Sequence, residues 1–126
     1  MLNAELRTTM VDNPVYEKSF EFAVRIVNLY KYLTAEKKEY VMSKQLLRCG
    51  TSIGANVAEA QKAQSHADFV TKMCIASKEA NETDYWLRLL NRTEYISQRQ
   101  FVSMRRDVNE LIALLTAICK TGMSKK

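Results

Sequence analysis

Helix-breaking residues are nearly absent from this 126-residue chain, which contains one proline and three glycines. The proline, Pro14, lies near the start, so almost the whole chain follows without one. Gly50 and Gly54 stand within a stretch, Gln45 to Leu90, whose apolar residues keep helical spacing. Each glycine destabilises a helix by about 0.8–1 kcal/mol relative to alanine, so we expect another helix to approach closely at this pair. The chain is therefore predicted to be all-α.

The first two helices are placed by local signals and by apolar periodicity. Asn13 followed by Pro14 is a favourable helix start, and the first helix is predicted to run to about Thr34. A short charged link then leads into the second helix, predicted over about 39–63.

The third and fourth helices have start signals of their own. Ser65 with Asp68, and Ser97 with Gln100, have the three-residue spacing of a capping box. Gly122 is expected to end the fourth helix. Four helices with short links predict an antiparallel up-down four-helix bundle. It is expected to fill a single domain, 1–126, with flexible tails at 1–12 and 123–126.

One apolar stripe on each of the last three helices is expected to face the core. The predicted inward residues are, on the second helix, Met42, Leu46, Cys49, Ile53, Val57 and Ala60; on the third, Phe69, Met73, Ala76, Ala80, Thr83, Leu87 and Leu90; and on the fourth, Val108, Leu111, Ile112, Leu115 and Ile118.

The first helix has two apolar stripes, which is more than one side of a small bundle needs. Because a lone monomer cannot cover both, we expect the second stripe to form a subunit interface. The first stripe is Tyr16, Phe20, Ala23, Val27 and Tyr30, and the second is Phe22, Ile26, Leu29 and Leu33.

The net charge of +5 at pH 7 suits an anionic partner such as nucleic acid, although solvated surface is the commoner role of such charges. Arginines late on the third helix and early on the fourth could together form a positive rim. The candidate nucleic-acid-binding residues are Arg88, Arg92, Arg99, Arg105 and Arg106. Tyr85 and Trp86 would be either a base-stacking platform or an aromatic pair at a helix–helix seam.

Polar residues along one edge of the second helix are expected to join a network with the third helix. We expect an interhelical, buried pair between Arg48 and Glu82, because an isolated buried carboxylate is very unfavourable. The predicted network that fixes helix register comprises Arg48, Ser52, Asn56, Glu59 and Glu82. A ligand or nucleic-acid site is the alternative. Catalysis by Glu59, Glu79 or Glu82 lacks a third group to position a substrate.

No cofactor or metal site is predicted. Cys49, Cys74 and Cys119 are widely spaced and odd in number, so they are interpreted as core thiols in a reducing compartment. His66, the one histidine, is interpreted as a surface turn residue rather than a ligand. No apolar run reaches membrane-spanning length, and a cytoplasmic protein is expected.

Two blocks of the sequence resemble the family of four-helix bundles named after proteins encoded in intervening sequences of bacterial 23S rRNA genes. The run LLRCGTSIGANVAEA resembles the family's second-helix signature, approximately R-x-x-x-S-I-x-x-N-x-A-E, and FVTKMCIASKEANETDYWLRLL resembles its third-helix signature. Family members often have serine where Glu79 stands. The similarity extends from Tyr16 to Lys120. The matching residues are Arg48, Ser52, Ile53, Asn56, Ala58 and Glu59, then Phe69, Ile75, Ala76, Glu82, Tyr85, Trp86 and Leu87.

The resemblance implies an antiparallel four-helix bundle that assembles into a ring-shaped homopentamer. A similar fold occurs in the accessory protein of diversity-generating retroelements, a basic pentameric barrel that binds nucleic acid and its reverse transcriptase. We therefore expect a non-catalytic, homo-oligomeric bundle that binds RNA or DNA through basic surface. The alternative is a protein-interaction scaffold, or accessory subunit of a nucleic-acid enzyme, without nucleic-acid contact of its own.

Overall fold

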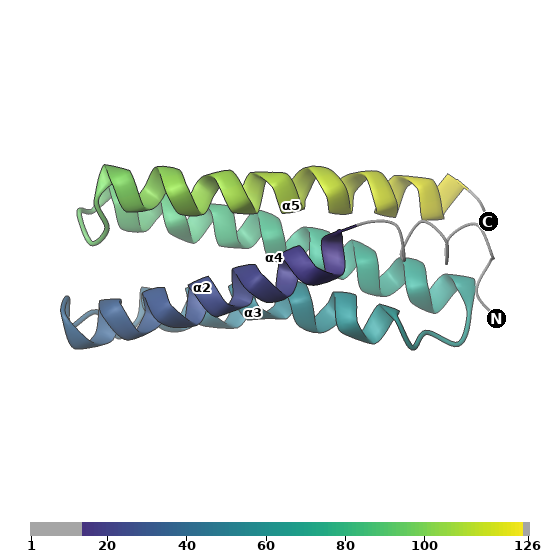
Figure 1. Ribbon diagram of the computed structural model, residues 1–126, viewed down its shortest axis with the longest axis horizontal. Coiled ribbons are helices and arrows are strands. Elements are labelled where there is room, and N and C mark those ends of the chain that lie inside the picture. Colours follow the sequence, from purple (N-terminus) through teal and green to yellow (C-terminus); the bar gives the residue numbers. More distant parts are fainter. Residues whose placement is uncertain (1–13, 125–126) are drawn as a thin grey trace.

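The computed structural model describes residues 14–124, and this part of the chain is a bundle of four α-helices (Figure 1). The helices are α2 (Val15–Ala35), α3 (Met42–Ala60), α4 (His66–Arg92) and α5 (Gln98–Ser124). Each helix packs antiparallel on the next, and α5 returns to α2 along the least closely packed seam. The predicted all-α fold and the up-down order of four helices are confirmed.

The two ends of the bundle carry different loops and helix ends. One end, on the left of Figure 1, carries the loops 36–41 and 93–97, and we call it the two-loop end. The opposite end carries the loop 61–65 and the end of α5, and the start of α2 points toward it but lies short of it. The arginine-rich segments of α4 and α5 both lie at the two-loop end.

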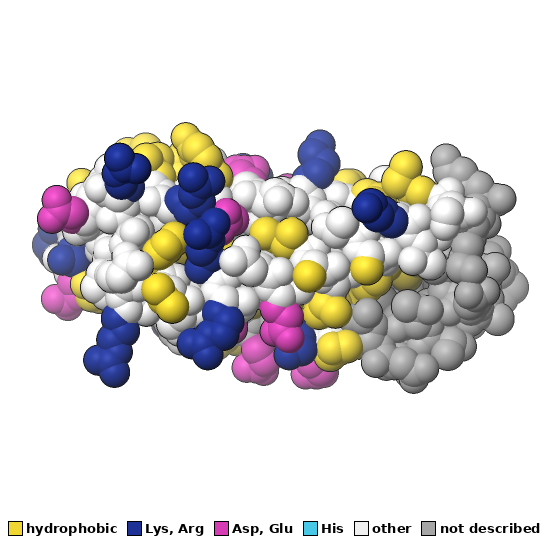
Figure 2. All heavy atoms as spheres, turned by 90° about the horizontal axis from the view of Figure 1, so that it is seen from above, with side chains coloured by type: hydrophobic (Ala, Val, Ile, Leu, Met, Phe, Trp, Pro, Cys, Tyr) yellow, Lys and Arg dark blue, Asp and Glu magenta, His cyan; other side chains and the backbone are white. Residues whose placement is uncertain are grey.

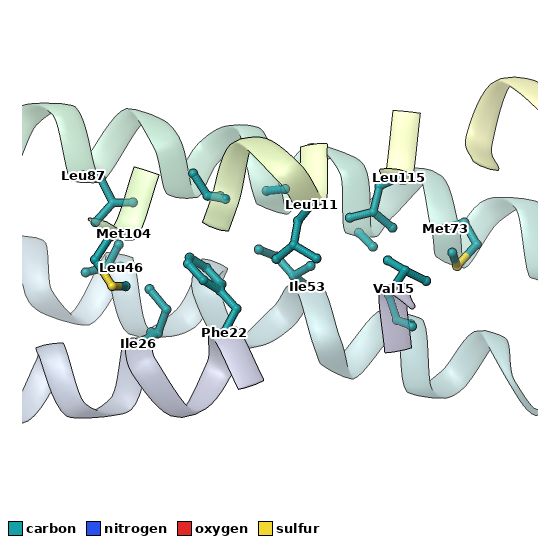
Figure 3. Packing of buried hydrophobic residues seen from close by; sticks show 14 of the residues in the cluster. Val15, Phe22, Ile26, Leu46, Ile53, Met73, Leu87, Met104, Leu111 and Leu115 are labelled. Atoms are coloured by element: carbon teal, nitrogen blue, oxygen red, sulfur yellow. The ribbon is translucent and has the colours of Figure 1, made fainter. Parts of the chain in front are cut away.

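All four helices contribute to one apolar core (Figure 3). Every predicted inward residue of α4 is buried, and so are those of α3 and α5 apart from the half-buried Met42 and Ile112. The buried side chains labelled in Figure 3 are Val15, Phe22, Ile26, Leu46, Ile53, Met73, Leu87, Met104, Leu111 and Leu115.

The prediction for α2 was wrong about which of its two apolar stripes is left uncovered by the chain's own core. Phe22 and Ile26 belong to the stripe assigned to a subunit interface, but they are buried in the chain's own core with Leu29 and Leu33. It is the other stripe that contains exposed side chains, with Phe20 61% exposed. The two glycines of α3 account for this result. Gly50 and Gly54 let α3 pack closely on α2, and the face of α2 that they contact is the one that carries Ile26 and Ser19.

A carboxylate caps the start of α3. The side chain of Glu39 accepts the backbone N–H groups of Val41, Met42 and Ser43 at 3.2, 3.0 and 2.7 Å. Burial by itself raises the pKa of the Glu39 carboxyl, but these hydrogen bonds outweigh burial, and the pKa lies below its ordinary value. The helix begins at Met42, three residues later than expected, with Val41 as its N-cap residue and the Glu39 carboxylate satisfying the first backbone N–H groups.

Serine hydroxyls cap the next two helices as the sequence indicates. The Asp68 backbone N–H donates to Ser65 Oγ at 3.0 Å. At α5 the capping box is reciprocal: Gln100 N–H donates to Ser97 Oγ at 3.1 Å, and Ser97 N–H donates to Gln100 Oε1 at 2.8 Å. Both predicted helix starts are confirmed.

Gly122 does not end α5, because the helix continues to Ser124. The glycine instead allows close packing on α4, since a Cβ at this position would lie 2.7 Å from Val70 Cγ2. Its carbonyl oxygen also lies 2.7 Å from Nε2 of His66, so that histidine holds the end of α5 rather than lying free in a turn. The expected cap Asn13, the tail 1–12 and residues 125–126 lie outside the described range.

The cysteine interpretation holds for one thiol only. Cys49 is a buried free thiol, whereas Cys74 of α4 and Cys119 of α5 form a disulfide. Their spacing of 45 residues carries no pairing signal, but antiparallel packing brings the two Cα atoms to 5.2 Å, within the usual range for a disulfide. Within residues 14–124, no helix is both long enough and apolar enough to cross a membrane.

Candidate nucleic-acid interface

The α3–α4 seam contains the expected interhelical ion pair. Arg48 Nη2 donates to Glu82 Oε2 at 2.8 Å, and the indole N–H of Trp86 donates to the same oxygen at 3.2 Å. We expected this pair to be buried, and that expectation was wrong. The Arg48 side chain is 55% exposed and the Glu82 side chain is 37% exposed. The pair therefore lies in solvent, where it adds little stability.

The remaining predicted members of the network bind elsewhere. Ser52 Oγ donates to the Arg48 carbonyl at 2.7 Å, and Asn56 Nδ2 donates to the Ser52 carbonyl at 2.8 Å. These bonds stay within α3, as short polar side chains commonly do in helices. Glu59 forms its ion pair with Lys72 of α4 at 2.9 Å. Ion pairs at two separate places along the α3–α4 seam, one around Arg48 and one at Glu59, thus replace the single predicted network.

Glu79 is a further carboxylate of α4, between Lys72 and Glu82 in the sequence. Its Oε1 is buried and lacks a hydrogen-bond partner within residues 14–124, although Arg48 Nη1 lies 3.9 Å away. Glu79 and Glu82 both lie beside Arg48, and Glu59 pairs with Lys72, so each of the three carboxylates has a cationic side chain close to it. The part of the chain that the structure describes holds no cluster of three ligand-type side chains able to bind a metal.

The predicted nucleic-acid-binding arginines all lie toward the two-loop end. Arg88 and Arg92 are exposed on α4, and Arg99 and Arg106 are exposed on α5; none of these four forms an ion pair with another described residue. Figure 2, which views the bundle from above, shows most of this face's lysine and arginine side chains in the half nearer that end. Unpaired cations of this kind remain available to an anionic partner.

Arg105 differs from the other four because it is held in place. Its Nε donates to Asp84 Oδ1 of α4 at 3.0 Å, and its guanidinium lies 5.5 Å from the centre of the Phe101 ring. A hollow of about 370 Å³ between α4 and α5 brings Arg105 together with Arg88, Arg92 and Tyr85. The structure thus assembles three of the five predicted arginines around one aromatic-lined hollow.

The two remaining arginines lie elsewhere. Arg99 lines a separate hollow of about 490 Å³ in the α2–α5 seam, and Arg106 lines neither hollow. Sequence reasoning missed Arg25 of α2, which lines the α2–α5 hollow and is held there by Asp107 and by Ser103 Oγ at 2.7 Å. No sequence signal marks this contact, because it depends on how α2 and α5 align.

The two adjacent aromatic residues take different roles. Trp86 is half-buried against the core and bonds to Glu82, as a residue of a helix seam does. Tyr85 is 55% exposed, contacts Trp86 edge to face at 5.1 Å between ring centres, and lines the hollow with Arg88 and Arg92. The ring available to a ligand is therefore that of Tyr85.

The fold and its arginine-rich end define a small helical bundle with a basic end surface. The chain belongs to the 23S rRNA-intervening sequence protein family, whose model matches residues 11–117. It is similar to a solved protein of unknown function from the S23 ribosomal protein family of Bacteroides thetaiotaomicron VPI-5482. The two are 63% identical, the match covers 86% of this chain and 97% of the other, and the TM-score is 0.84. Among curated proteins, none matches this chain.

Proposed function

We propose that this protein is a non-catalytic homo-oligomer, a pentameric ring, that binds RNA or DNA through the arginines of its two-loop end. The observation that carries the proposal is the set of exposed cations without carboxylate partners among the described residues, two of which share a hollow with Tyr85. Backbone phosphates are the partner that such cations fit without sequence preference.

The exposed stripe of α2 supports self-association. Tyr16, Phe20, Val24 and Val27 lie along one face of the helix, and each is at least 36% exposed. Contiguous apolar surface of this kind is typical of an interface between protein molecules. Association would also bring several basic ends onto one polynucleotide, which raises the overall affinity without any new contact.

Binding is tested by titrating salt against labelled RNA and DNA. Because each neutralised phosphate releases counterions, log K should fall linearly with log salt, by about 0.7–0.9 per phosphate contact. The variant R88Q/R92Q/R99Q should bind more weakly and with a shallower slope. The matched control K120Q removes an exposed charge near the other end of the bundle and should behave as wild type. Absence of binding at low ionic strength would refute the nucleic-acid proposal.

Assembly is tested by light scattering and sedimentation at micromolar concentration. The wild type should exceed the chain mass of 14.5 kDa several-fold, with five copies as the expected number. F20E/V24E places charges in the exposed stripe and should yield monomers of unchanged helicity. The control Y40E alters an exposed aromatic residue outside α2 and should leave the assembly intact. A monomeric wild type would remove the oligomer from the proposal.

A second candidate function, a scaffold for a nucleic-acid enzyme, is favoured by Tyr40 and Val41. These two residues, 54% and 73% exposed, lie at the two-loop end. Protein capture by the scaffold should survive R88Q/R92Q/R99Q and be lost in Y40S/V41S. Nucleic-acid binding should show the opposite pattern.

A further inference from the structure

Three hollows on the described surface are neighbours at the two-loop end, and each shares lining residues with the next. The α2–α5 hollow shares Tyr32 and Gln100 with a hollow of about 420 Å³ beside the loop 93–97. That second hollow shares Asn91 with the α4–α5 hollow of about 370 Å³. These three neighbouring hollows, which we together call the end track, lie in sequence from the α2–α5 seam around this end to the α4–α5 groove.

Every section of the end track contains an aromatic ring. Tyr32 lines the first two hollows, Tyr95 lines the second, and Tyr85 and Phe101 line the third. Rings at successive positions along a groove are what exposed nucleobases stack on, with little dependence on base identity. The guanidinium of Arg105 over Phe101 adds a flat cationic surface, which also stacks on bases.

The charges along the end track are strongly unequal. Six cationic side chains line it against one carboxylate, that of Glu94. Two of the cations are fixed by ion pairs with Asp107 and Asp84. The other four have no ion-pair partner among the described residues and can follow a phosphate backbone. The six cations are Arg25, Lys37, Arg88, Arg92, Arg99 and Arg105.

We propose that the end track binds single-stranded nucleic acid, with bases against its rings and phosphates along its cations. This inference rests on the proposed function and narrows it to one class of polynucleotide. In a duplex the bases are stacked inside, so a duplex can use the cations but not the rings. A single strand can use both. Phosphate contacts alone would not distinguish the two forms.

The test compares fluorescence anisotropy for single-stranded RNA and DNA with that for duplexes carrying the same number of phosphates. A length series from about 4 to 16 nucleotides covers the site sizes of stacking grooves. Single strands should bind at least about tenfold more tightly than duplexes at matched salt. Y32L/Y85L/F101L should weaken single-strand binding by about tenfold or more and leave duplex binding and the salt slope unchanged.

The variants are chosen to preserve the fold. Tyr32 and Phe101 pack partly on the core, so leucine keeps an apolar side chain while removing the ring. Y85L alone changes a 55% exposed residue, and a roughly threefold loss of single-strand binding is expected even if the triple variant is unstable. Y40L is the control, because Tyr40 is exposed at the same end but lines none of the three hollows.

Two different results would contradict the inference, and the measurements distinguish them. Equal binding of single strands and duplexes, with Y85L and Y32L/Y85L/F101L indistinguishable from wild type, would overturn the end track and leave the proposed function standing. No binding of either form at low salt would overturn both. Sensitivity to ring removal together with single-strand preference supports the inference.

Discussion

Gly50 of α3 contacts Ile26 of α2 so closely that a Cβ added to the glycine would lie 2.7 Å from Ile26 Cγ1. Ile26 is fully buried and all three of its outer carbons would be within 2.9 Å of that Cβ, so it cannot move aside. We expect G50A to destabilise the chain by about 1–2 kcal/mol in urea unfolding, because overpacking exceeds the gain in helix propensity. G54A should be milder, since its Cβ would lie 3.2 Å from the Ser19 carbonyl oxygen.

The same contact can be examined by a double-mutant cycle. I26A removes the three carbons that the new Cβ would meet, so G50A should be less damaging in that background than in wild type. Equal effects in both backgrounds would show that the two residues do not determine how closely α2 and α3 pack.

The Arg48–Glu82 pair should contribute little to stability. Both side chains are more than one-third exposed, so R48A should reduce the free energy of unfolding by about 0.2–1 kcal/mol, and less at high salt. E82Q serves as the matched variant and should lose a similar amount. A loss of 3 kcal/mol or more would indicate that the pair becomes buried in the assembled protein.

The Glu39 cap should make stability depend on pH. Its folded-state pKa is lowered, so its contribution is fully present above the ordinary glutamate pKa of about 4.3 and is lost as pH falls through the lower folded value. E39A should cost about 0.5–2 kcal/mol at pH 7, and the difference from wild type should narrow at acidic pH. Urea unfolding of E39A and wild type at pH 7 and at an acidic pH measures this difference in stability. E36A, in the same loop but exposed, should show no such difference.

Thiol reactivity should report both cysteine environments. Burial raises the pKa of Cys49 to about 11, so this thiol should be unreactive toward a disulfide reagent in the native protein at pH 8. One thiol per chain should react after unfolding without reductant, and three after unfolding with prior reduction and removal of the reductant. Three reactive thiols without reduction would contradict the Cys74–Cys119 disulfide.

That disulfide should also stabilise the fold. It closes a 45-residue separation between α4 and α5, and restricting the unfolded chain in this way is worth about 2–4 kcal/mol. C74S/C119S should unfold at correspondingly lower urea concentration than the oxidised wild type. The double variant is the appropriate comparison, because a single substitution leaves a new free thiol. Equal midpoints would indicate that the bond does not form in solution.

Local signals in the sequence were sufficient for the starts of α4 and α5 and for most of the core. Ser97 and Gln100 identify the start of α5 because both hydrogen bonds of a capping box lie within four residues. The apolar period of α4 identified its whole buried face, since helical geometry fixes which residues share a side. The start of α3 was misplaced because Glu39 caps it through a carboxylate reaching three backbone N–H groups, a less common arrangement.

The amino-acid sequence by itself determined the order and approximate extent of the helices, which residues of α3, α4 and α5 face inward, and that the chain is basic. Only the tertiary structure decided which stripe of α2 is buried, that Cys74 meets Cys119, and that Arg25 and Tyr32 lie beside Arg99. Those outcomes depend on the rotation and alignment of one helix against another. Both are set by the close contacts of glycines and core side chains across the seams, which have no counterpart in the spacing along a single helix.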